Sequence, residues 1–333
     1  MSTARRVFFS LAALSQMAFT VPSPAWDSGN KSTIYGDRKL TIAARTTTSR
    51  LPIWSTNIKV PYRSWIPVDR PREVLLCIHG LGFSSESFAE LGRVLARRGF
   101  AVYALDVRGF GEWMNRKQDR VNFEGCLSDV EACLRALRKA YPGVPIFLMG
   151  ESMGGAIALR ATSRYPDLVD GLVCSVPSSD RYAKLSSELI VGMRYLENKD
   201  KPMDIAPEVV NRTTANQALR SQWKAEPTNR MKMTPQELKQ FNDFMKGNYD
   251  AAALVEKTPV VMLAGFKDRL VKPEGTIELF NDLSTQDKLL MVVGDGEHLL
   301  LEENQLTEQL EQLLVDWIKN ESRSRRPGVT AHP

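Results

Sequence analysis

Ser152 lies in the pentapeptide GESMG (150–154), which follows the apolar residues IFLM. The residues after it are small and apolar, as at the start of a buried helix. A Gly-x-Ser-x-Gly pattern between a strand and a helix is typical of a sharp turn that exposes a serine hydroxyl above a sheet. The following helix N-terminus presents backbone N–H groups that can bind an anion. The pattern therefore predicts that Ser152 is a nucleophile.

A serine hydroxyl becomes reactive when a neighbouring base accepts its proton. The chain has three histidines. His332 lies in the C-terminal tail, and His79 ends an apolar run before Gly80, where we assign it to an oxyanion-binding loop. His298, in DGEHLLL between the last apolar run and the last helix-like segment, is therefore predicted to be the base.

An acidic side chain is expected to orient this histidine and to stabilise its charged form. In folds with such a turn, the acid comes between serine and histidine in the chain, after a strand. Asp268, after the run PVVMLAG, has this position. Asp180, after the preceding run, is the second choice. Asp295 shares a loop with His298 and is poorly directed toward it.

The segment IHGLG (78–82) follows another apolar run. A glycine-rich turn here can direct a backbone N–H group toward the oxygen that becomes negative during acyl transfer. We expect the backbone amides of Leu81 and Met153 to form this oxyanion hole.

The same region permits a different function. GLGFSS (80–85) follows a strand and opens a helix, and Asp106 comes at the next strand end, as in dinucleotide-binding proteins. However, Ser85 occupies the place of the third glycine. A nicotinamide-dependent oxidoreductase would also leave the serine, histidine and aspartate above without a role. We therefore interpret LDVRGFGEW (105–113) as a turn that Asp106 and Arg108 hold in place.

Strand-like and helix-like segments alternate from residue 74 onward. Near-continuous apolar runs suit parallel strands that are covered on both faces, and they occupy residues 74–79, 101–107, 146–150, 171–176, 259–265 and 288–294. Amphipathic segments between them predict helices, and hence a parallel α/β sheet. Residues 51–68 alternate in polarity and are expected to form an antiparallel hairpin before the sheet.

The alternation stops between residues 178 and 257, where polar helical segments carry scattered Met, Tyr and Trp. This interval is too long for a loop. We predict a helical cap there, inserted between two parts of the core, 51–177 and 258–320. Its apolar residues are expected either to pack inside the cap or to line a pocket above the serine: Met193, Tyr195, Trp223, Phe241, Phe244 and Met245.

The two ends of the chain have their own compositions. Residues 1–25 combine Arg5 and Arg6, an apolar stretch and small residues, which predicts a signal for export or, if it is not cleaved, a membrane anchor. A cytoplasmic location is less favoured.

Residues 321–333 are predicted to form a disordered basic tail. Because the net charge of +5 comes partly from these ends, no nucleic-acid-binding face is predicted, and a weak attraction to a membrane surface is compatible with it.

The four cysteines do not predict disulfides. Cys77 and Cys174 lie in strand-like runs, and Cys126 and Cys133 lie about 10 Å apart along one predicted helix, too far to bridge. All four are expected in the core. No Cys/His cluster suggests a metal, and no cofactor is expected.

In this order and spacing, HGLG, DVRGFGEW, GESMGG, GFKDRLV and GEH resemble the α/β-hydrolase superfamily, and within it the monoacylglycerol lipase and lysophospholipase group, which shares ancestry with serine aminopeptidases. The likeness covers roughly residues 60–318. It implies a mostly parallel eight-stranded sheet with helices on both faces, a helical cap, and hydrolysis through an acyl-enzyme without a cofactor.

By position in these motifs, the resemblance implies that Ser152 is the nucleophile, Asp268 the acid and His298 the base, with Leu81 and Met153 as oxyanion amides. One departure is Phe110 in RGFG, where many relatives have histidine, but that position is not catalytic.

Together these features predict a serine hydrolase that cleaves carboxylic esters. The resemblance implies a lipid-like substrate, such as a monoacylglycerol or lysophospholipid. An aminopeptidase or amidase of the same fold would need a carboxylate for the substrate ammonium, for which Glu151 and Glu226 are candidates. A third alternative is a binding module of this fold without chemistry. The sequence leaves substrate-binding residues and oligomeric state open.

Overall fold

The computed structural model describes residues 59–115, 120–177, 180–182, 184–301 and 305–324. The predicted signal segment 1–25 and His332 lie outside the described residues. Within these ranges, every helix is too short or too polar to cross a bilayer.

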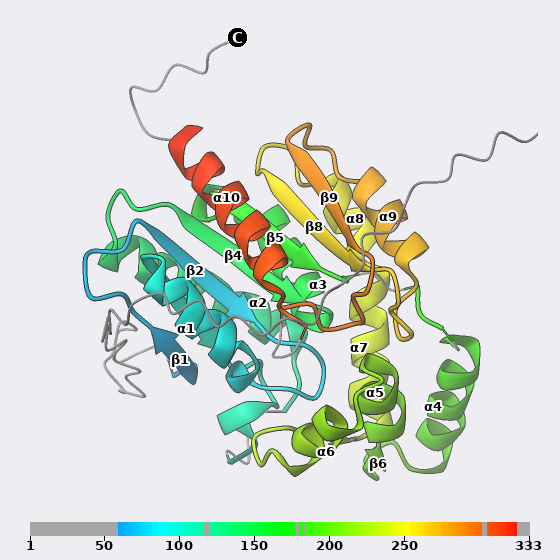
Figure 1. Ribbon diagram of the computed structural model, residues 1–333. Coiled ribbons are helices and arrows are strands. Elements are labelled where there is room, and N and C mark those ends of the chain that lie inside the picture. Colours follow the sequence, from blue (N-terminus) through cyan, green and yellow to red (C-terminus); the bar gives the residue numbers. More distant parts are fainter. Residues whose placement is uncertain (1–58, 116–119, 178–179, 183, 302–304, 325–333) are drawn as a thin grey trace, which may run out of the picture. The chain divides into compact units, whose positions relative to one another are not determined.

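A seven-stranded sheet forms the centre of the described fold (Figure 1), with strand order β1-β3-β2-β4-β5-β8-β9. All six apolar runs form its parallel strands, as predicted, and β1 pairs antiparallel with β3. The strands are β1 (Tyr62–Trp65), β2 (Glu73–Ile78), β3 (Phe100–Leu105), β4 (Ile146–Glu151), β5 (Gly171–Ser175), β8 (Val260–Gly265) and β9 (Lys288–Val293). The expected eighth strand is not among the described residues, and the first part of the expected hairpin, 51–58, lies outside them.

The sheet is covered on both faces because alternate strand residues enter two separate apolar clusters. In β2, Leu75 and Cys77 pack with α1 and α10, whereas Leu76 and Ile78 pack with α2 and α3. Five strands are buried at every position, but the edge strand β9 is only partly buried. The core helices are α1 (Ala89–Arg97), α2 (Phe123–Ala140), α3 (Met153–Arg164), α9 (Pro273–Asn281) and α10 (Glu308–Ser324).

The C-terminal helix α10 continues into the segment that was expected to be a tail. Glu321 and Ser322 are buried in its last turns. The expectation that a disordered tail begins at residue 321 was therefore wrong for residues 321–324.

All four cysteines are buried and free. Cys126 and Cys133 lie on α2, and Cys77 and Cys174 lie on β2 and β5. Each packs among apolar side chains of the core.

Between β5 and β8 the chain forms a mainly helical segment beyond the carboxyl ends of the strands (Figure 1). We call residues 180–247 of this segment the cap. Asn248, just after the cap, donates a hydrogen bond from Nδ2 to the carbonyl oxygen of Pro177, just before it, at 2.8 Å. The elements are α4 (Lys184–Asn198), β6 (Met203–Asp204), α5 (Ala206–Thr213), α6 (Gln217–Ala225), β7 (Lys232–Met233) and α7 (Pro235–Lys246), followed by α8 (Asn248–Ala253) on the core.

Local sequence explains where α7 of the cap begins. Thr234 and Glu237 form a capping box, in which the threonine side chain accepts from the Glu237 amide and the glutamate accepts from the Thr234 amide. Pro235 fits the first turn because its missing N–H would have no partner there.

Candidate active site

Ser152 lies at the turn between β4 and α3 with φ 55° and ψ −117°. The glycines around it are required by close backbone contacts. A Cβ atom at Gly150 would lie 2.1 Å from the carbonyl oxygen of Gly154, and one at Gly154 would lie 1.9 Å from that of Ile78. Side chains are excluded at both positions, so the GESMG sequence is explained by the sharpness of the turn.

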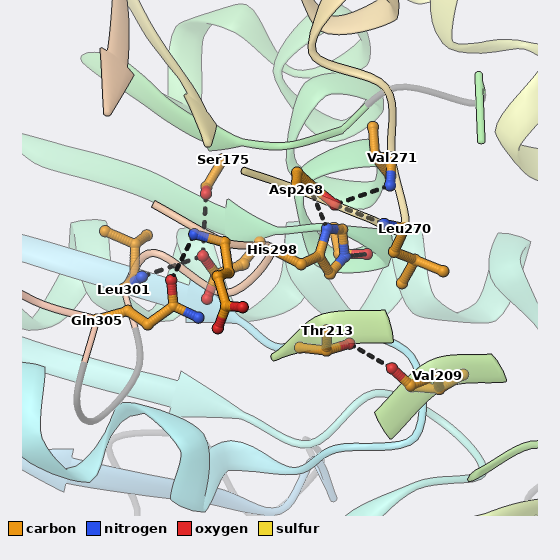
Figure 2. Close-up of polar contacts among 12 residues, drawn as sticks. Ser175, Val209, Thr213, Asp268, Leu270, Val271, His298, Leu301 and Gln305 are labelled. Carbon is orange, nitrogen blue, oxygen red and sulfur yellow. Dashed lines mark hydrogen bonds and ion pairs between the residues drawn. The ribbon is translucent and has the colours of Figure 1, made fainter. Parts of the chain in front are cut away.

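The structure brings Ser152, His298 and Asp268 together in one hydrogen-bonded chain. Ser152 Oγ lies 2.9 Å from His298 Nε2. His298 Nδ1 lies 2.7 Å from Asp268 Oδ2, as Figure 2 shows. His298 and Asp268 are both buried. With Nδ1 donating to the carboxylate, Nε2 is the nitrogen that can accept the serine proton.

The second oxygen of Asp268 holds the carboxylate in place. Oδ1 accepts hydrogen bonds from the amides of Leu270 and Val271 at 2.8 and 2.9 Å (Figure 2). These bonds leave Oδ2 directed at His298.

The other two candidate acids are engaged elsewhere. Asp180 forms an ion pair with Lys272 at 3.1 Å, and Asp295 is exposed and pairs with Lys267. Neither carboxylate is bonded to His298 in the structure.

His79 lies beneath the loop that carries Leu81. Its Nε2 accepts from the amide of Val107 at 3.0 Å, so Nδ1 carries the proton and donates to the carbonyl oxygen of Gly80 at 2.8 Å. The amide of Phe83 donates to the same oxygen at 3.2 Å. Burial lowers the pKa of His79, which favours the neutral ring that these bonds require.

These contacts fix the peptide between Gly80 and Leu81. In a trans peptide the N–H group points opposite to the carbonyl group, so the Leu81 amide faces away from His79. Gly80 lies close to Ser152, because a Cβ atom there would lie 3.5 Å from Ser152 Cβ.

Asp106, the aspartate of the alternative dinucleotide-binding pattern, forms hydrogen bonds inside the fold. Its carboxylate accepts from the amides of Ser85 and Glu112 at 2.8 and 2.9 Å. Arg108 makes two hydrogen bonds to Asp129, at 2.6 and 2.8 Å. Both side chains hold loops, as the sequence predicted.

A cavity of about 40 Å³ lies above Ser152 and His298, and a second cavity of about 150 Å³ lies under the cap. Leu81, Val209 and Phe241 line both of them, so the two adjoin. Most of the lining is apolar. Of the six cap residues named from the sequence, Phe241 and Met245 line the cavity above the serine.

The other four cap residues lie elsewhere. Trp223 packs edge-on against Phe83, and Phe244 stacks on Phe123 at a ring-centroid distance of 4.4 Å, so both join the cap to the core. Tyr195 is not among the described residues that line either cavity. Met193 does not line them and is half exposed, because it lies on the outward face of α4.

Sequence reasoning missed two charged residues that line both cavities, Arg181 and Glu208. Arg181 donates to Asn242 at 2.6 Å, and burial lowers its pKa. Glu208 pairs with Arg212 at 3.2 Å. Arg181 precedes α4 in an isolated β-bridge with Val271, and Glu208 lies in α5, so no single spacing pattern indicated that both face the cavities.

It also missed Glu297, which joins the cap to the loop of His298. The Glu297 carboxylate accepts from the hydroxyl of Thr214 and from the amide of Ala215, the latter at 2.7 Å. The amide of His298 donates to the carbonyl oxygen of Thr213 at 3.2 Å. The adjacency of Glu297 to His298 in GEH is the only signal that the sequence offered.

The two carboxylates considered for binding a substrate ammonium do not line the cavity above Ser152. Glu151 is buried beneath the turn, where it accepts from Ser175 and Leu301. Glu226 accepts from the amide and hydroxyl of Thr228. Among the described residues, no group of His, Cys, Asp and Glu side chains is arranged to hold a metal ion.

The sequence profile of the serine aminopeptidase S33 family matches residues 69–305. The chain belongs to this family. The S33 match spans the turn at Ser152, the cap, Asp268 and His298.

Two curated relatives of this S33-family chain are monoacylglycerol lipases. Human monoglyceride lipase is 26% identical over 284 residues, which cover 81% of this chain and 89% of the relative. The monoacylglycerol lipase of Mycolicibacterium smegmatis is 22% identical over 246 residues, covering 74% and 88%.

Solved structures show the same fold. A soluble variant of the Saccharomyces cerevisiae monoglyceride lipase, crystallised with a substrate analogue, has a TM-score of 0.67 at 18% identity, covering 82% of this chain and 97% of that one. The monoacylglycerol lipase of Paleococcus ferrophilus has a TM-score of 0.66 at 21% identity, covering 79% and 99%. The predicted α/β-hydrolase fold is confirmed.

Proposed function

We propose that this protein is a serine hydrolase that cleaves carboxylic esters of monoacylglycerol-like lipids through an acyl-enzyme. The observation that carries the proposal is the hydrogen-bonded chain from Ser152 through His298 to Asp268 at the floor of a mostly apolar cavity.

In the first step, Ser152 Oγ attacks the ester carbonyl carbon while His298 Nε2 accepts its proton. Asp268 holds Nδ1–H and stabilises the imidazolium. When the tetrahedral intermediate collapses, His298 returns the proton to the departing alcohol oxygen. A water molecule then attacks the acyl carbonyl carbon while His298 accepts its proton. The bond between the acyl group and Ser152 Oγ breaks, His298 returns the proton to Oγ, and the fatty acid leaves.

The backbone amides of Leu81 and Met153 are proposed to bind the negative oxygen of each intermediate. Two observations support this role: Met153 begins α3, and the contacts of His79 and Phe83 turn the Leu81 amide away from the core. Loss of one such donor typically costs about 3 kcal/mol of transition-state stabilisation.

The substrate class is supported by the adjoining apolar cavities and by the names of the relatives. Space lined by Val209, Phe241 and Leu238 suits an acyl chain, which gains about 0.8 kcal/mol for each buried methylene group. A lysophospholipid has the same ester and acyl chain and remains within the proposal.

An aminopeptidase function finds less support. Glu208 is a carboxylate at the cavity above Ser152, but it is already paired with Arg212 and shares that cavity with Arg181. A substrate ammonium would therefore enter a site that already holds a cation.

We further propose that the protein works at a membrane surface. Four apolar side chains of α4 are exposed: Leu189, Ile190, Met193 and Leu196. Leu189, Met193 and Leu196 recur at helical spacing on one side of α4. Ile190 lies at the border of that side and also lines the cavity under the cap. Export through residues 1–25 remains part of the proposal and rests on the sequence alone.

The test is hydrolysis of monoacylglycerols and p-nitrophenyl esters of increasing chain length, with aminoacyl p-nitroanilides beside them. Wild type should cleave the esters, with the highest kcat/KM for acyl chains that fill both cavities, and Ser152→Ala should be inactive. Cleavage of the anilides alone would favour the aminopeptidase. Ligand binding without turnover by folded wild type would favour the non-catalytic module.

A further inference from the structure

Glu151 is a buried ionisable residue beside the nucleophile that the mechanism above does not use. It is the last residue of β4, directly before Ser152, and its exposed fraction is 1%. It does not line the cavity above Ser152, so it is not placed to bind substrate.

The Glu151 carboxyl group joins three segments of the site. Its Oε1 accepts from Ser175 Oγ at 2.9 Å and from the amide of Leu301 at 3.1 Å (Figure 2). Ser175 ends β5, and its carbonyl oxygen accepts from the Ser152 amide at 2.8 Å. Leu301 lies on the loop that carries His298. One carboxyl group therefore connects the turn of the nucleophile to the loop of the base.

The charge of this group is sensitive to pH. Burial raises the pKa of Glu151 to about 7, although hydrogen bonds from Leu301 and Ser175 and the charge of His298 oppose the rise. His298 is the titratable group whose charge acts on it, and the other described groups that act on it are the Ser175 hydroxyl and the amides of Leu300 and Leu301.

Protonation need not disturb these contacts. Oε2 is buried and has no hydrogen-bond partner among the described residues. A proton on Oε2 leaves Oε1 as a carbonyl oxygen, which still accepts from Ser175 and Leu301. The hydrogen bonds to the His298 loop can therefore persist in both states, while the negative charge that acts on His298 appears only in the ionised state.

We propose that Glu151 is a positioning residue that holds the His298 loop against the nucleophile turn and whose negative charge stabilises the protonated His298 formed during reaction. This inference rests on the proposed function, because it assumes that Ser152 passes its proton to His298.

A fluorophosphonate probe tests the inference without knowledge of the natural substrate. Ser152 Oγ forms a bond to phosphorus, the P–F bond breaks, fluoride leaves, and the serine proton passes to His298. The labelling rate is measured from about pH 5.5 to about pH 9 for wild type and Glu151→Gln. Glutamine retains the acceptor oxygen and the volume but carries no charge.

The ratio of wild-type to Glu151→Gln labelling rates should rise roughly threefold to tenfold as pH passes through 7, because only wild type gains the charge. Glu73→Gln is the matched control, since Glu73 is also buried but begins β2, at the opposite end of its strand from the site. The ratio of wild-type to Glu73→Gln labelling rates should not change with pH. A flat ratio for Glu151→Gln would overturn the electrostatic role.

Two further variants test the positioning role and the identity of the group that titrates. Glu151→Ala should label more slowly than Glu151→Gln at every pH, because it also loses the acceptor for Leu301; equal rates would overturn the positioning role. Ser175→Ala removes a hydrogen-bond donor that stabilises the ionised Glu151 carboxylate, so the pKa of Glu151 should rise. The change in the labelling-rate ratio should therefore occur at a higher pH. An unmoved midpoint would show that another group titrates.

The experiments distinguish an error in the proposed function from an error in the proposed role of Glu151. If wild type is labelled at Ser152 but cleaves no ester, the proposed substrate class is wrong and the pH comparison still tests Glu151. If Ser152 of folded wild type is not labelled at any pH, both proposals fail.

Discussion

The two carboxylate oxygens of Asp268 have different hydrogen-bond partners. One oxygen is fixed by the amides of Leu270 and Val271, and the other faces His298. Replacement by asparagine retains the shape but puts an NH2 group in place of one carboxylate oxygen. If the NH2 group points at His298, it meets the Nδ1–H group. If it points the other way, it meets the N–H groups of Leu270 and Val271. Either way, two donors face each other and a hydrogen bond is lost.

We therefore expect Asp268→Asn to fold but to lower kcat by roughly a thousandfold to ten-thousandfold, because the His298 tautomer is no longer fixed. Ester hydrolysis with a circular-dichroism check of folding measures this. Asp180→Asn is the control, since Asp180 pairs with Lys272 and is not bonded to His298. A similar loss in both variants would contradict the assignment of the acid.

At this scale the sequence was sufficient to identify the residues that the structure brings together. Only three histidines were available, and the glycines around Ser152 have a backbone reason that the motif expresses. Arg181 and Glu208 were missed because charged residues normally face water, and only tertiary packing turned these two toward the cavities.

Among the elements, the parallel strands were the most predictable because burial on both faces demands continuous apolar runs. The cap was harder. Its helices are amphipathic with more than one apolar surface, so sequence indicated a helical segment but not which side of α4 faces the cavities. Met193 was misplaced for this reason, since it shares the outward side with Leu189 and Leu196.

Contacts of Glu297 join the cap to the loop that carries His298. Glu297→Ala removes a charged acceptor from Thr214 and Ala215, which should lower kcat/KM for esters by roughly tenfold or more. Asp295→Ala on the same loop is the matched control, because Asp295 is exposed and pairs with Lys267 rather than with the cap. Equal effects of the two substitutions on ester kinetics would show that the cap contact is not responsible.

At the scale of the described molecule, the exposed side of α4 and the cavity behind it suggest how a lipid reaches Ser152. Leu189 and Leu196 have exposed fractions of 64% and 87%, and contact with a lipid surface would remove these side chains from water.

Replacing Leu189, Met193 and Leu196 together by serine should weaken binding to phosphatidylcholine vesicles by roughly a hundredfold or more, as measured by sedimentation, since each side chain loses roughly 1 to 2 kcal/mol of apolar burial. Hydrolysis of a short soluble ester should be unchanged, because these side chains do not line the cavity above Ser152. Unaltered vesicle binding, or an equal loss on the soluble ester, would contradict a membrane role for this helix face.

The hydrogen bond between Pro177 and Asn248 has a consequence for how such a protein can change over generations. The chain leaves the core at Pro177 and returns to it at Asn248, and these two points touch. An insertion, deletion or exchange between them therefore alters neither the order nor the register of the strands that carry the reacting groups. Selection can remodel substrate preference in one stretch of the gene while the sheet is inherited intact, as long as the cap keeps its contacts with Glu297 and His298.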